Sequence, residues 1–237
     1  LANERGDRAL ELAALLPQAT IYTIPTARMD WDKGSLLLSR TLALAQELHD
    51  RPTEAKVLWN LMLLETFAGE EREKAVGYGE QSLAIAREHN LREQEAFTLH
   101  DLADAYLFSG RQEEGWAALE EAGRLWHELG NLPMLTDYLA SAALWKCFRG
   151  ELDAGFPLAE EALRLSQSIH NLWGEAYSLM VFGPLYLERG EMEKGITALE
   201  NSISTGESTG FVGPGMLFRP FLAWVFGALG DVERGME

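Results

Sequence analysis

The residue types best suited to chemistry in this sequence lie close together on one predicted helix. They are His100, Asp101 and Asp104. A histidine beside carboxylates can act as a general base or hold a metal ion. Such a role also needs a nucleophile or a complete ligand set, and the sequence offers neither. We therefore expect no catalytic residue, no metal site and no cofactor, and we expect that the chain is not an enzyme.

The other histidines and a set of glutamates follow the spacing of a repeat. His49, His89 and His170 each stand directly before the Asp or Asn of a predicted turn. A histidine is favoured there by the helix dipole and by unpaired carbonyl groups, so a structural role is expected. Glutamate recurs every 40 residues on predicted second helices, which favours a solvated stripe over paired catalytic carboxylates: Glu80, Glu120, Glu160 and Glu200.

The single cysteine and the glycine-rich stretch give no sign of a reactive site. Cys147 has no second cysteine to pair with, so an intramolecular disulfide and a cysteine-based metal cluster are both excluded. A packed thiol is the expected state. The segment from Gly206 to Gly215 contains no lysine, and the phosphate-binding pattern G-x-x-x-x-G-K-[ST] is absent. A turn is expected there.

Composition narrows the class of partner. The chain has 237 residues, 47% of them hydrophobic, and a formal net charge of -17. The apolar content is enough for a continuous core, while the acidic surface disfavours nucleic acid and anionic membranes. No apolar run reaches the roughly 18 residues of a membrane span, and no signal peptide is visible. We expect a cytoplasmic segment and, because the chain starts at Leu1, a piece of a longer protein.

The main organising feature is a repeat of about 40 residues. One glycine recurs at Gly110, Gly150, Gly190 and Gly230, and a second recurs five residues later, at Gly115, Gly155, Gly195 and Gly235. Between these marks the apolar residues follow a helical period, as in Leu99, Leu102, Ala103 and Tyr106. Glycine in a helix costs about 1 kcal/mol relative to alanine, so its repetition indicates close helix packing. The pattern predicts all-α helical hairpins.

The hairpin pattern gives expected boundaries. Residues 1–29 are expected to form an N-terminal helix over Leu1–Leu16, ended by Pro17, and then an irregular stretch that is either a degraded first helix or an extended connection. The repeat array then covers 30–237, divided into 30–50 (partial), 51–90, 91–130, 131–170, 171–210 and 211–237 (partial).

These marks resemble the tetratricopeptide repeat family. The family spacing of a small residue, an aromatic residue, glycine and two further small residues is matched by Ala103, Tyr106, Gly110, Gly115 and Ala122. The third hairpin departs from it, with Lys146 at the aromatic position. The common period is 34, so each helix here is longer. Such long repeats resemble those of large bacterial signalling proteins, such as ATP-dependent transcriptional activators of the maltose-regulon type and ATPases with nucleotide-cyclase modules.

The resemblance implies a right-handed superhelix, an α-solenoid whose first helices line a concave groove. Applied to this sequence, the groove-facing positions hold aromatic side chains with a few polar groups, which suits a peptide or a partner helix. The expected partner-binding residues are Lys56, Trp59, Phe97, His100, Asp104, Phe108, Asp137, Tyr177 and Met180. An alternative for each is packing between repeats.

Two functions remain open at this point. The first is a protein-binding or peptide-binding module that serves as the regulatory or scaffold segment of a larger bacterial signalling or transcription-regulating protein. The second is a repeat domain that senses a small effector and relays it to an ATPase or output domain outside this segment. The last hairpin is unusually aromatic, with Phe218, Phe221 and Trp224, so its apolar end is expected either to associate with a second copy or to be covered by residues outside this segment.

Overall fold

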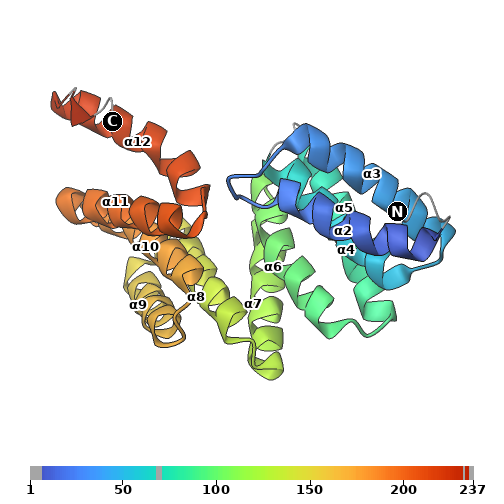
Figure 1. Cartoon of the computed structure of the whole chain (residues 1–237). Coiled ribbons are helices and arrows are strands. Elements are labelled where there is room, and N and C mark those ends of the chain that lie inside the picture. Colours follow the sequence, from blue (N-terminus) through green and yellow to red (C-terminus); the bar gives the residue numbers. More distant parts are fainter. Residues whose placement is uncertain (1–6, 68–70, 232, 235–237) are drawn as a thin grey trace. The chain divides into compact units, whose positions relative to one another are not determined.

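A computed structural model describes residues 7–67, 71–231 and 233–234, and every described element in it is an α-helix. Helices that open a hairpin alternate with helices that close it (Figure 1). The opening helices are α2 (Arg8–Thr23), α4 (Arg51–Phe67), α6 (Arg92–Phe108), α8 (Leu132–Phe148), α10 (Leu172–Glu188) and α12 (Gly213–Leu229). The closing helices are α3 (Trp31–Glu47), α5 (Arg72–Glu88), α7 (Gln112–Leu129), α9 (Leu152–Ser168) and α11 (Met192–Thr209).

The chain divides into two compact units, Leu1–Gly130 and Asn131–Glu237. In the first unit the hairpins α2/α3, α4/α5 and α6/α7 stack in chain order, and α4 also packs against α2 and α6. In the second unit α8/α9 packs against α10/α11, and α12 packs mainly against α11. The prediction of stacked helical hairpins is confirmed within each unit.

Each unit is built around small apolar clusters between neighbouring helices. In the first unit Met62, Ala75, Val76, Leu102 and Ala105 are buried together. In the second unit one cluster joins α8, α9, α10 and α11. Both clusters therefore join neighbouring hairpins.

The turn that ends an opening helix is the same in successive hairpins. Gly110, Gly150 and Gly190 adopt φ angles of 82°, 72° and 80°, a region that costs an L side chain energy and costs glycine none. The residue after the glycine closes the turn; for example, the Glu191 amide donates to the Tyr186 carbonyl at 2.8 Å. This is the hydrogen bond of a helix-ending Schellman turn.

The inner glycines lie where the two helices of a hairpin approach each other. A Cβ atom on Gly155 would lie 3.2 Å from the carbonyl oxygen of Ala143, and one on Gly195 would lie 3.2 Å from that of Gly183. The repeated glycine is therefore explained by close backbone contact, as its position in the helix indicated.

The first hairpin differs from the sequence prediction. The expectation that Pro17 ends a helix is wrong, because α2 continues through it to Thr23. Pro17 is exposed, while Leu12 and Leu15 before it and Ala19 after it are buried. Packing on both sides of the proline offsets the loss of one backbone hydrogen bond. The stretch thought to be irregular is thus mostly the end of the opening helix that pairs with α3.

Candidate binding surfaces

The opening helices of the first unit bring aromatic side chains together. Trp59 on α4 and Phe97 on α6 lie with ring centroids 5.4 Å apart, and Phe97 meets the edge of Trp126 on α7 at 4.8 Å. Trp59 and Phe97 are both half-buried. The indole Nε1–H of Trp59 donates to Oδ2 of Asp101 at 2.6 Å, which fixes the orientation of the ring.

Two further predicted residues of the first unit, one charged and one aromatic, reach the surface. Lys56 is exposed, one turn before Trp59 on α4. Phe108 is 48% exposed at the end of α6, and the Arg72 guanidinium lies 5.3 Å from its ring centroid. An exposed aromatic surface beside a cation suits contact with another macromolecule.

His100 and Asp104 lie one turn apart on α6, but they differ in exposure. His100 is only 8% exposed, and burial lowers its pKa to about 4. The imidazole is therefore neutral near pH 7, and little of it is accessible to a ligand. Asp104 is half-buried. Of the two, Asp104 is better placed to touch a partner.

In the second unit the predicted residues lie on α8 and α10. The Tyr177 hydroxyl and the Ser141 hydroxyl are hydrogen-bonded at 2.9 Å, which ties α10 to α8. Met180 is 7% exposed and belongs mostly to the core. The two predicted residues on α10 are therefore one bridging side chain, Tyr177, and one packing side chain, Met180.

Asp137 is the most unusual ionisable group of the second unit. Its Oδ1 atom is buried without a hydrogen-bond partner among the described residues. Burial raises the pKa of its carboxyl group to about 7. A buried carboxylate of this kind costs stability, and such costs concentrate at functional sites.

Sequence reasoning missed the side chains that hold the predicted ones in place. Asp101 anchors Trp59, Ser141 anchors Tyr177, and Trp126 supports Phe97. A signal for two of them was present: Asp101 and Ser141 are 40 residues apart and occupy the same position of the repeat. No comparable signal marks Trp126.

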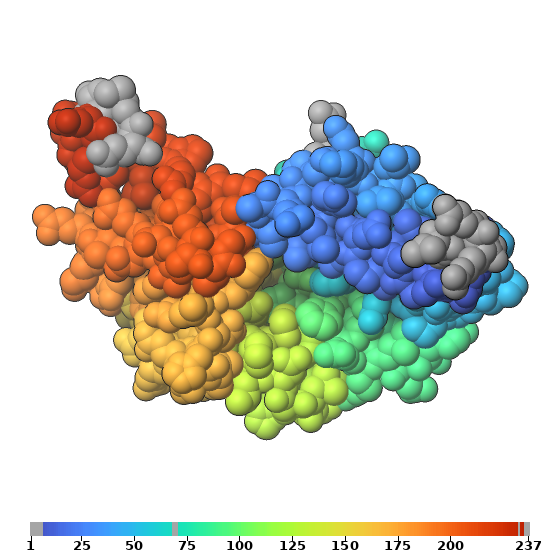
Figure 2. Space-filling model, in the orientation of Figure 1, coloured from blue at the N-terminus to red at the C-terminus, as the bar shows by residue number. Residues whose placement is uncertain are grey.

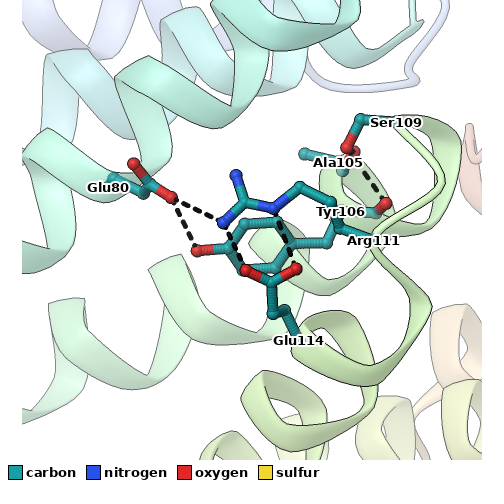
Figure 3. A network of polar contacts seen from close by, with 6 residues as sticks. All are labelled: Glu80, Ala105, Tyr106, Ser109, Arg111 and Glu114. Carbon is teal, nitrogen blue, oxygen red and sulfur yellow. Dashed lines mark hydrogen bonds and ion pairs between the residues drawn. The ribbon is translucent and has the colours of Figure 1, made fainter.

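The other face of the first unit carries a polar network, shown in Figure 3. Glu80 on α5 accepts hydrogen bonds from the Tyr106 hydroxyl at 3.0 Å and from Arg111 at 3.3 Å, and Arg111 also pairs with Glu114 on α7. Burial, followed by the Glu80 carboxylate, raises the pKa of Tyr106 to about 12. The network joins α5, α6 and the start of α7, and we interpret it as structural.

The described residues contain neither a metal-binding cluster nor a membrane-spanning helix. No group of three or more His, Cys, Asp or Glu side chains among the described residues is arranged to hold a metal ion. None of the described helices is long and apolar enough to cross a membrane.

Comparison with known proteins identifies the fold. A Rap protein complexed with Competence and Sporulation Factor matches with a TM-score of 0.72 at 13% identity, over 99% of this chain and 69% of that chain. The apo form of RapI matches with a TM-score of 0.69 at 14% identity, over 86% and 73%. A Podosopora anserina putative kinesin light chain with nearly identical TPR-like repeats matches with a TM-score of 0.60 at 18% identity, over 84% and 96%.

These structures are those of helical repeat proteins, and the chain has their tetratricopeptide-like solenoid fold. No family model matches the sequence, and no curated protein matches it. At identities this low the likeness establishes the fold alone, so function has to be argued from the surfaces described above.

Proposed function

We propose that the chain is a protein-binding module that holds a peptide or a partner helix against its opening helices. The observation that carries this proposal is the Trp59–Phe97 pair, whose rings are half-exposed and whose orientation is fixed by Asp101. Oriented aromatic side chains at a surface are typical anchors of protein interfaces. Tyr177, held by Ser141, offers a second anchor in the second unit.

The comparisons support this proposal at the level of fold. One similar structure is a Rap protein complexed with Competence and Sporulation Factor, so an array of this fold can hold a second molecule. We further propose that the segment has a regulatory or scaffold role in a larger cytoplasmic signalling or transcription-regulating protein. The resemblance of its long repeats to those of bacterial regulators supports that context.

The test is selection of a phage-displayed peptide library on the immobilised chain, followed by titration of one selected peptide by fluorescence anisotropy. We expect W59A to lower the affinity for that peptide at least about tenfold, because a central aromatic anchor contributes about 2 kcal/mol or more to binding. L36A, which removes an exposed side chain from α3, should leave the affinity unchanged. Peptides that bind W59A and the original chain equally would contradict the proposal for the Trp59 surface.

We also propose a second copy of this chain as a partner, through α12. This helix lies at one end of the second unit (Figure 2). It exposes Met216, Leu217, Trp224 and Leu229, and its only charged residue is Arg219, which pairs with Glu207. An exposed apolar patch of this kind favours association.

A further inference from the structure

The second unit has an open groove on the side opposite to the Tyr177 surface. It is a hollow of about 480 Å³ bounded by α9, α10 and α11, which we call the outer groove. Its floor is a stripe of α10, namely Leu179, Phe182 and Tyr186. Leu163 of α9 forms one wall, and Thr197 and Asn201 of α11 line the other. None of the residues predicted from sequence to bind a partner lines it.

A comparison of equivalent repeat positions explains why ion pairs cross this part of the hairpins in the first unit and leave it open in the second. In the first unit Glu80, Arg111 and Glu114 connect α5 to α7 across the outside of the hairpins (Figure 3). The same repeat positions in the second unit hold Glu160, Glu191 and Lys194. A glutamate has replaced the bridging arginine, and two carboxylates cannot form an ion pair.

The change from arginine to glutamate alters the surroundings of the repeat's tyrosine, which is Tyr106 in the first unit and Tyr186 in the second. Tyr106 donates its hydroxyl proton to Glu80, whereas the Tyr186 ring lies beside two cations, with Arg189 Cζ 5.5 Å and Lys194 Nζ 5.6 Å from its centroid. Glu191 instead pairs with Arg189 and Lys194. The Tyr186 ring stays at the floor of the groove, stacked on Phe182 at 5.8 Å.

The rim indicates an open trough and not an enclosed pocket. Lys194, Thr197 and Asn201 are all exposed, so a ligand would remain accessible along its length. Small molecules are usually held in enclosed sites, whereas extended peptides lie in troughs. The two charged residues that line the groove, Glu193 and Lys194, have charges that sum to zero. An uncharged occupant matches this balance, and the overall charge of -17 opposes an acidic one.

The size and the polar groups of the trough suit a peptide backbone. The floor stripe from Leu179 to Tyr186 spans seven residues of helix, or about 10 Å. That length equals about three residues of extended chain. The Asn201 carboxamide can donate to a peptide carbonyl and accept from a peptide N–H at the same time, and the Thr197 hydroxyl lies one turn before it.

We propose that the outer groove binds an extended, uncharged peptide segment of about three residues, with an aromatic side chain on the Phe182–Tyr186 floor. This site shares no residue with the surface proposed around Trp59 in the first unit or with the one proposed around Tyr177 in the second. Either site can therefore fail an experiment without the other.

The experiment is an NMR titration of the ¹⁵N-labelled chain with the blocked tripeptide N-acetyl-Ser-Trp-Ser-amide. We expect saturable shifts of the Phe182, Thr197 and Asn201 amides at millimolar peptide. N-acetyl-tryptophanamide should bind at least about fivefold more weakly, because it carries the ring with less backbone to pair with Asn201. N-acetyl-Asp-Trp-Asp-amide should also bind more weakly, because it adds negative charge.

Matched variants separate recognition from folding. N201A should lower the affinity for the tripeptide about fivefold, because the exposed carboxamide is lost without a change in the core. S204A, also exposed on α11, is the control and should bind normally. Equal affinity of N201A and the original chain, or of the tripeptide and the single amino-acid amide, would overturn the proposal. Shifts confined to Trp59 or Tyr177, or no shift up to about 10 mM, would also overturn it.

Discussion

Asp137 and His100 have opposite effects on how stability depends on pH. The pKa of Asp137 is raised to about 7, above its ordinary value of 3.8, so the folded chain binds this proton more tightly than the unfolded chain. The contribution of Asp137 to the free energy of unfolding is fully present below about pH 4 and is lost as the pH rises through 7. The pKa of His100 is lowered to about 4 from 6.5, so its contribution is lost as the pH falls from 6.5 to 4.

We predict that D137N stabilises the chain at pH 8 and has little effect below about pH 4. The upper limit of the gain is about 4 kcal/mol, from the distance between the two pKa values. Urea unfolding of both proteins at a series of pH values measures the difference. A gain that is the same at pH 4 and pH 8 would show that the carboxyl group is not the cause.

For His100 the prediction concerns how stability changes at acidic pH. In the original chain the two groups nearly offset each other between pH 6.5 and 4, since burial shifts their pKa values in opposite directions. H100Q should remove a loss of about 3 kcal/mol over this interval, so that acidification stabilises the variant. The imidazole pKa itself can be followed by NMR, and a titration near 6.5 would contradict the prediction.

At the scale of the helix, the glycines test the packing of a hairpin. A Cβ atom on Gly195 would lie 2.7 Å from Leu187 Cγ, while one on Gly77 of α5 would meet nothing within 4 Å. We predict that G195A destabilises the chain by about 1–3 kcal/mol, despite the better helix propensity of alanine. G77A, the matched control, should be more stable by up to about 1 kcal/mol. Chemical denaturation measures the free energy of unfolding of both variants. Equal changes in G195A and G77A would contradict the packing explanation.

The helices also show how far the sequence determines the fold. Gly110, Gly150 and Gly190 marked the turns because a left-handed φ favours glycine, and Gly155 and Gly195 marked the places where two helices approach closely. The helix through Pro17 could not be predicted, since its stability comes from burial of Leu15 and Ala19 against other helices. Local propensity indicated the opposite.

The binding surfaces were harder to predict than the helices. The repeat marks Trp59, Phe97 and Tyr177 as members of one face, but it does not reveal that Asp101 and Ser141 orient them. His100 is a groove position by spacing and is nevertheless buried. The outer groove depends on which charges replace Arg111 and Glu114 two hairpins later, and this comparison needs both geometries.

At the scale of the whole molecule, we predict association through α12. Trp224 is 70% exposed, and W224E should weaken self-association at least about tenfold, because a charge would replace a buried aromatic anchor. Each copy carries a charge of -17, so added salt should strengthen the association. Sedimentation equilibrium at low and high salt measures both effects.

The control for this prediction is L36E, which places the same charge at an equally exposed position of α3. It should associate as the original chain does. A chain that stays monomeric up to about 0.2 mM, or one in which L36E and W224E act alike, would contradict a role for α12.

The glycine turns also bear on how such an array can change through gene duplication. Each turn is built within one block of about 40 residues, so a duplicated block brings a complete turn to both of its junctions. No new loop has to be found, and the copied helices meet neighbours of the kind they already fit. The surface residues are copied as well and can then diverge under separate selection. Phe97, Asp137 and Tyr177, which share one repeat position, show three outcomes of such divergence.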